Sequence, residues 1–292
     1  MNYRILSFRD FSKQLIETGD LDPVYIAVHE VFQNKDPNQL KRWLLSYGMF
    51  YHVGISSYLS SFSQPEEFWE TIEIAAKNEQ PSPLGGRWPR SSERRHFRGQ
   101  QALNLVADMK NRYEYNPHGF IDYIAAGAPD AKEIRKRVEE HVGFGGWASF
   151  KFCDLLDRVV GIPVEMDLTE AMYEEPTKGA YIVAKESQKF NLLREDVKEI
   201  SIRFAVEEFN EATRGLMAPP RFERELGFLE TETALCKFKG HFKGRYPIGK
   251  DIKECLHGSR DWAEESVLSG DLYTVFNRLY DNLPRKGTLF QC

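Results

Sequence analysis

Apolar side chains recur at intervals of three and four positions along most of this chain, which is the spacing of helices with one buried face. The pattern is clear in residues 36–59, where Leu40, Trp43 and Tyr47 are spaced in this way. Asp36, which a proline follows, can begin this helix because a carboxylate caps the free amide groups of a first turn. The spacing therefore predicts a helical segment here.

Other segments share this period. They predict helices over residues 64–78, 96–111, 116–127, 129–141, 193–215, 221–238 and 271–283. Alternation typical of a strand is confined to residues 180–184. The sequence thus predicts an all-α protein. Because it contains no repeat, low-complexity tract or flexible linker, we expect residues 1–292 to form a single compact unit.

Composition narrows the functional classes. The 292 residues are 41% hydrophobic and carry a formal net charge of −5, which is typical of a globular protein and argues against a generally basic nucleic-acid coat. No apolar run is long enough for a signal peptide or a membrane span, so a cytoplasmic protein without a membrane partner is expected. The cysteines fit no zinc or iron–sulfur spacing, and we predict neither a metal centre nor a cofactor. They are Cys153, Cys236, Cys255 and Cys292.

Positive charge is concentrated in two segments. Residues 236–253 hold six basic side chains, including Lys239, Lys243 and Arg245, against one acid. Residues 85–99 hold five arginines within twelve positions, against one acid. These arginines are Arg87, Arg90, Arg94, Arg95 and Arg98. Such clusters are often solvated surfaces, but guanidinium groups also bind phosphate oxygens in a fixed bidentate geometry.

If a helix begins near residue 92, Arg94, Arg98 and Gln101 fall on one of its faces. Arg95 then points elsewhere, so the five arginines cannot all reach one pocket.

Three glycines join two helical runs within residues 138–161. Gly143, Gly145 and Gly146 allow a tight turn, and their bare backbone also lets a phosphate approach the amide N–H groups. Such a turn can hold a DNA backbone without reading its sequence. A glycine-rich link between packed helices is also a common structural feature, so both interpretations stay open on this evidence.

The run from Val142 to Gly145, followed by an apolar helix, resembles the hairpin of the helix-hairpin-helix DNA glycosylase superfamily. In that superfamily a catalytic Asp follows the hairpin by about twenty residues, and Asp167 follows Gly145 by 22 positions. The resemblance implies a glycosylase-like helical core at about 84–217, with additional helices at 1–80 and 220–292. Asp167 could equally cap the helix that follows it.

The sequence also departs from that superfamily. Trp147 stands where the bifunctional enzymes carry a Schiff-base lysine, and Lys151 comes one helical turn later. The iron–sulfur loop of some members is absent. Imine chemistry at the hairpin is therefore not expected.

The arginine-rich segment, together with residues 232–252, resembles a narrower phage family, the α-glutamyl/putrescinyl-thymine pyrophosphorylases or amino acid:DNA transferases. The resemblance spans roughly residues 40–255. It implies replacement of pyrophosphate on 5-(pyrophosphoryloxymethyl)uracil in DNA by an amino acid, during thymine hypermodification. A separate kinase would act first, because this chain has no glycine-rich nucleotide loop.

These residues suit that chemistry. The five arginines are the predicted pyrophosphate ligands, and Asp167 is the predicted base or electrostatic stabiliser. Glu165 and Glu170 are weaker candidates for binding the ammonium group of the amino acid. The three hairpin glycines with Lys239, Lys243 and Arg245 are predicted to contact the DNA backbone. Trp147, Phe144 and Trp88 are candidates for the pocket of an extruded base, although large aromatics usually lie in the core.

Two alternatives remain at this stage. A monofunctional glycosylase would use Asp167 and the hairpin to cut a base from DNA. A non-catalytic DNA-binding protein would need only the glycines and the basic segments. Neither has an evident need for a polyanion pocket. The predicted partners are double-stranded DNA carrying a modified thymine and a free amino acid; a divalent metal could assist pyrophosphate departure, but no ligand cluster requires one.

Overall fold

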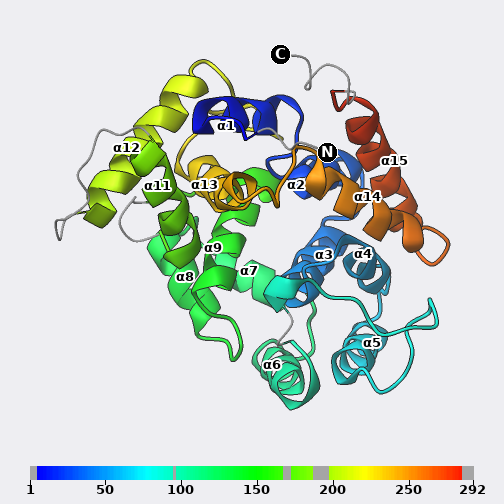
Figure 1. Cartoon of the computed structure of the whole chain (residues 1–292). Coiled ribbons are helices and arrows are strands. Elements are labelled where there is room, and N and C mark those ends of the chain that lie inside the picture. The colour runs from blue at the N-terminus through cyan, green and yellow to red at the C-terminus, as the bar shows by residue number, and fades with distance from the viewer. Residues whose placement is uncertain (1–4, 95–96, 167–171, 187–196, 285–292) are drawn as a thin grey trace. The chain divides into compact units, whose positions relative to one another are not determined.

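The computed structural model describes residues 5–94, 97–166, 172–186 and 197–284. Within these ranges the secondary structure is helical, with one isolated β-bridge between Met217 and Glu225 (Figure 1). The predicted all-α class is therefore confirmed. The expected strand-like segment at 180–184 is instead part of α11 (Glu174–Glu186), because its neighbours continue the helical hydrogen bonding.

The contacts within the chain define two compact units. The first comprises residues 1–26, 165–253 and 278–292, and the second comprises residues 27–164 and 254–277. Three helices contribute residues to both units: α2 (Pro23–Phe32), α14 (Lys250–Asp261) and α15 (Val267–Asp281). The expected single unit, with a core at 84–217 and flanks at 1–80 and 220–292, stays a prediction.

The second unit contains the longer uninterrupted series of helices. These are α3 (Pro37–Phe50), α4 (Val53–Ser60), α5 (Pro65–Lys77), η1 (Ser92–Arg94), α6 (Gly99–Arg112), α7 (Gly119–Ala125), α8 (Ala131–Glu139), α9 (Gly146–Leu155) and the π-helical η2 (Leu156–Val160). Asp36 caps α3 as predicted, accepting from the Asn38 amide at 3.0 Å. The segment predicted at 36–59 divides at Tyr51, whose left-handed backbone (φ 50°) ends α3 before His52 begins α4.

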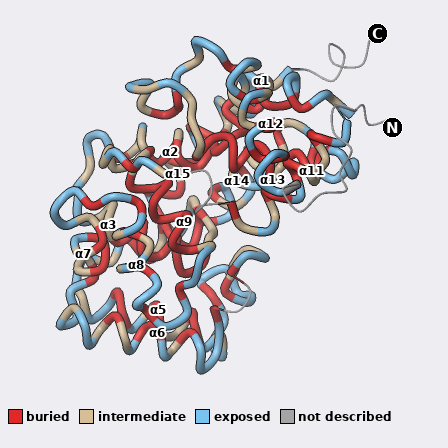
Figure 2. Tube along the Cα trace, turned by 90° about the vertical axis from the view of Figure 1, so that its left-hand side faces the viewer, coloured by how far each residue is buried: buried red, intermediate tan, exposed pale blue. Residues whose placement is uncertain are grey.

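The first unit is built around α13 (Phe228–Phe242), which is buried along most of its length (Figure 2). Helices α1 (Phe8–Glu17), α11 and α12 (Val197–Ala212) pack with it. Gly179 of α11 lies directly against the backbone of Leu235, so close that a side chain at position 179 would collide with it. The two helices can therefore approach at this point only because residue 179 is a glycine.

Candidate active site

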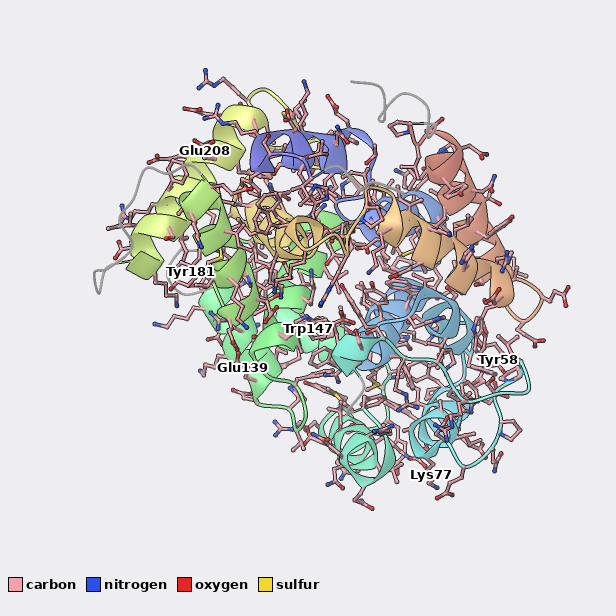
Figure 3. All side chains as sticks on the ribbon, viewed as in Figure 1. Tyr58, Lys77, Glu139, Trp147, Tyr181 and Glu208 are labelled. Carbon is pink, nitrogen blue, oxygen red and sulfur yellow. The ribbon has the colours of Figure 1, made fainter. Side chains whose placement is uncertain are left out.

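The glycine-rich link joins two helices that pack against each other, as the sequence predicted. Helix α8 is capped by Asp130, which accepts from the Glu133 amide at 2.8 Å. Gly143 adopts φ +84° in the turn, a conformation that side chains disfavour. Ser149 Oγ donates to Glu139 Oε1 at 2.6 Å and so ties the first turn of α9 to the last turn of α8. Glu139 and Trp147 mark the two helices in Figure 3.

The first turn of α9 presents unsatisfied hydrogen-bond donors to the surroundings. Gly145 is the N-cap and offers no side chain, and the backbone N–H groups of Gly145, Gly146 and Trp147 have no partner in the part of the chain that the structure describes. Among the described residues, and apart from the adjoining backbone, no atom lies within 4 Å of the position that a Cβ would take on Gly145 or Gly146. Free N–H groups and the positive end of a helix dipole favour an anion at this position.

Arg94 lies directly behind this hairpin, although it is only 9% exposed. Its Nη1 donates to the Gly143 carbonyl at 3.3 Å and its Nε to the Met49 carbonyl at 3.1 Å. Aromatic rings surround the guanidinium carbon at 5.3–6.0 Å. They belong to Phe97, Phe144 and Trp147.

No carboxylate among the described residues pairs with Arg94, and burial lowers the pKa of its guanidinium to about 10. The guanidinium therefore stays charged at neutral pH. Its charge adds to the positive potential at the hairpin.

The remaining arginines of the cluster divide by burial. Arg90 is half-buried and donates to the carbonyls of Ala75, at 3.1 Å, and Phe97. Burial and the nearby charge of Arg98 lower the pKa of Arg90. Arg98 and Arg87 are exposed. Arg95 lies outside the described residues.

The arginines do not share one helical face, because α6 begins only at Gly99. The face proposed for Arg94, Arg98 and Gln101 is therefore wrong. Arg94 ends the short η1 helix, and Arg98 has an extended backbone (φ −161°) just before α6. Gly99 follows at φ +58°, which turns the chain between Arg98 and Gln101.

Of the three aromatics predicted to line a base pocket, only Trp147 is partly exposed. Its ring meets the Tyr51 ring edge-on, with centroids 4.9 Å apart. Phe144 is buried, and Trp88, at 5% exposure, packs against Tyr58 and Trp262. The base-pocket assignments stay predictions, and the geometry favours Trp147.

Sequence reasoning missed a buried charge cluster on the same side of α9 as Trp147. Lys151 Nζ lies 3.4 Å from Asp154 Oδ2, and Arg158 Nη1 lies 3.5 Å from Asp154 Oδ1. Asp154 is fully buried. The spacings of three and four positions between these charges, inside an apolar helix, were a visible sign of an internal ion-pair network.

The basic residues predicted to contact DNA in the first unit differ in their surroundings. Lys239 forms an ion pair with Glu175. Lys243 and Arg245 are exposed, and their side chains have no hydrogen-bond or ion-pair partner among the described residues. The neighbouring Lys237 is only partly exposed and pairs with Asp251 at 2.7 Å. Lys243 and Arg245 therefore have the more accessible charges.

Asp167 and Glu170 lie outside the described residues. In the described ranges, no group of three or more His, Cys, Asp and Glu side chains is placed to hold a metal ion. None of the helices in those ranges is both long and apolar enough to cross a membrane.

Comparison with known proteins identifies the family. Residues 16–246 match the amino acid:DNA transferase family. The chain is 38% identical over 277 residues to the glycinyltransferase of Pseudomonas phage PaMx11, covering 91% of this chain and 94% of that protein. It is 28% identical over 283 residues to the putrescinyltransferase of Delftia phage PhiW-14, covering 94% and 86%.

The chain therefore belongs to the amino acid:DNA transferase family. It is a transferase whose substrates are DNA and an amino acid donor. The family resemblance inferred from the sequence is confirmed, whereas the relation to helix-hairpin-helix glycosylases stays a prediction.

Proposed function

We propose that this transferase displaces pyrophosphate from 5-(pyrophosphoryloxymethyl)uracil in double-stranded DNA and attaches the donor in its place. The observation that supports this most directly is the open first turn of α9 with the buried Arg94 charge behind it. A separate kinase supplies the pyrophosphorylated base before this step. The reaction takes place on phage DNA in the cytoplasm of the infected bacterium.

The hairpin holds a DNA phosphate in this proposal. The N–H groups of Gly145, Gly146 and Trp147 have no partner among the described residues, and Gly145 and Gly146 carry no side chain that would keep phosphate oxygens from them. Arg94 fixes the Gly143 carbonyl and so keeps the turn in the conformation that exposes these donors. Arg94 is then a positioning residue rather than a direct ligand.

The exposed arginines bind the leaving group. A nucleophilic nitrogen of the donor forms a bond to the exocyclic methylene carbon, the carbon–oxygen bond to pyrophosphate breaks, and pyrophosphate leaves with the bonding electrons. Arg87 and Arg98 can approach a polyanion, because their side chains are exposed. Arg95 stays a candidate from the sequence.

The attacking nitrogen must lose a proton, and Asp167 is the predicted acceptor or the electrostatic stabiliser of positive charge at the methylene. Access to that carbon calls for extrusion of the base, which costs a few kcal/mol. Stacking on the partly exposed Trp147 would offset part of this cost.

A transfer assay tests the function. The protein is incubated with duplex DNA bearing 5-(pyrophosphoryloxymethyl)uracil and a mixture of amino acids and putrescine, and the nucleosides are analysed by mass spectrometry. A new thymidine adduct with release of pyrophosphate supports the proposal. Abasic sites would identify a glycosylase, and DNA that is bound but unchanged would identify a non-catalytic binding protein.

Replacement of Arg98 tests the leaving-group assignment. We expect Arg98→Ala to lower kcat/KM for the pyrophosphorylated DNA by roughly tenfold or more, the effect of a lost charge-assisted hydrogen bond. Arg260, an exposed arginine of the same unit, provides the matched control, and Arg260→Ala should retain wild-type kcat/KM. Unchanged turnover by Arg98→Ala would exclude Arg98 from the pyrophosphate site.

Arg94→Ala is a less direct test, because it leaves two backbone carbonyls without their donor. Loss of these buried hydrogen bonds is expected to lower the free energy of unfolding as well as the activity.

A further inference from the structure

The first unit contains a cavity of about 770 Å³ that lies within the usual size range of small-molecule sites. It is formed by the end of α12, the bridged segment around Leu216 and Glu225, and the start of α13. Figure 3 labels Glu208 on α12 near this end of the helix. Met166, which directly precedes Asp167 in the chain, also lines the cavity.

One wall of the cavity is polar. Glu207, Asn210 and Glu211 are spaced three and four positions apart, so they lie on one face of the last turns of α12, and Arg214 follows just beyond the helix. In the described part of the chain, the side chains of Glu207, Asn210 and Arg214 have no hydrogen-bond or ion-pair partner. Glu211 contacts Arg9.

Apolar side chains also line the cavity, among them Leu216, Leu226 and Phe228. Glu225 adds a third carboxylate to the lining. Three carboxylates and the carbonyl end of α12 attract a cation, whereas the single Arg214 can pair with one carboxylate of a ligand. The apolar side chains can contact the carbon chain that links those groups.

We infer that this cavity binds the amine donor, with Glu207 and Glu211 holding the ammonium group and Arg214 holding the carboxylate when the donor has one. That the bound amine is the donor of the transfer reaction rests on the proposed function. The binding site itself is argued independently of that role, because Glu207 and Arg214, whose side chains have no partner among the described residues, line the same cavity as several apolar side chains.

Direct binding tests this assignment. Radiolabelled glycine, glutamate and putrescine are dialysed to equilibrium against the full-length protein, with and without unmodified duplex DNA. We expect the wild type to retain at least one probe, and Glu207→Gln to weaken binding roughly tenfold or more. Arg214→Ala should weaken the binding of glycine or glutamate but not that of putrescine, which has no carboxylate.

Glu199→Gln is the matched control, because Glu199 lies on α12, is exposed and does not line the cavity. A wild type that retains no probe under either condition would overturn the inference. Wild-type affinity in both Glu207→Gln and Arg214→Ala would do the same.

The transfer assay separates this inference from the function. Transfer by the wild type, together with unaltered probe binding in both variants, would uphold the function and exclude the cavity. Probe binding that the variants lose, without any transfer to pyrophosphorylated DNA, would uphold the cavity and overturn the proposed function.

Discussion

Asp20 in the first unit shows how burial changes the chemistry of a single side chain. Its carboxylate accepts from the amides of Gly249, at 2.7 Å, and Ile252, at 3.0 Å, and so holds the start of α14. Burial raises the pKa of Asp20 to about 6; the charge of Lys237 opposes this rise, and that of Asp251 adds to it. The folded protein therefore binds a proton here more tightly than the unfolded chain.

This shift predicts that stability depends on pH. Because the folded pKa exceeds the unfolded value of 3.8, the stabilisation is present below about pH 4 and is lost as pH rises through about 6. A shift of about two pKa units corresponds to about 3 kcal/mol. The free energy of unfolding of the wild type, relative to Asp20→Asn, should therefore fall by about 2 kcal/mol between pH 4 and pH 6.5, since part of the stabilisation is already lost at pH 4.

Urea unfolding at several pH values measures this difference. Glu66→Gln changes an exposed carboxylate and serves as the control. If the difference between the wild type and Asp20→Asn is the same at every pH, Asp20 does not titrate differently in the folded state.

Within the hairpin formed by α8 and α9, the glycines have different roles. Gly143 has φ +84° and is required by the turn. Gly145 has φ −121°, which any residue can adopt, and open space surrounds it. The backbone conformation therefore does not require a glycine at position 145. The missing side chain instead leaves the amide groups accessible.

Two alanine substitutions should separate these tasks. Gly143→Ala should lower the free energy of unfolding by about 1–2 kcal/mol, the cost of a left-handed backbone. Gly145→Ala should leave stability within about 0.5 kcal/mol of the wild type. It should still weaken DNA binding severalfold, because its methyl group would block the approach of a phosphate.

Chemical unfolding and fluorescence anisotropy with duplex DNA measure the two effects. Gly270→Ala adds a methyl group within α15, where the nearest atom is 4.0 Å away, and should not change the affinity. Wild-type DNA affinity in Gly145→Ala would argue against phosphate binding at this turn.

At the scale of the whole molecule, charge distribution matters more than net charge. The chain carries −5, yet Lys243 and Arg245 present exposed charges after α13. Contacts between such side chains and DNA phosphates release counterions, which makes the affinity dependent on salt. A protein with a net negative charge can therefore bind DNA through local basic surfaces.

Phosphate contacts by Lys243 and Arg245 would make DNA binding depend on salt concentration. Lys243→Ala and Arg245→Ala should each reduce the slope of log affinity against log salt concentration by about 1. Lys239→Ala should change it less, because Lys239 is already paired with Glu175. Titrations at four or more salt concentrations measure the slope, and an unchanged slope in both of the first two variants would exclude these residues from phosphate contact.

Features that depend on neighbouring residues could be predicted from the sequence. The apolar period predicted helices that the structure contains, such as α5 and α8, and the glycines located the link between α8 and α9. Helix boundaries were less predictable. A single left-handed residue, Tyr51, divided one predicted helix, because its conformation depends on local backbone geometry that the apolar period does not encode.

The burial of charged and aromatic side chains, in contrast, depends on how distant segments of the chain pack together. Arg94 looked like an exposed ligand, but it donates to the carbonyls of residues 45 and 49 positions away along the chain. The converging walls around Glu207 and Arg214 likewise come from separate segments. Burial and charge pairing depend on partners distant in sequence, whereas helical periodicity depends on neighbours within a turn or two.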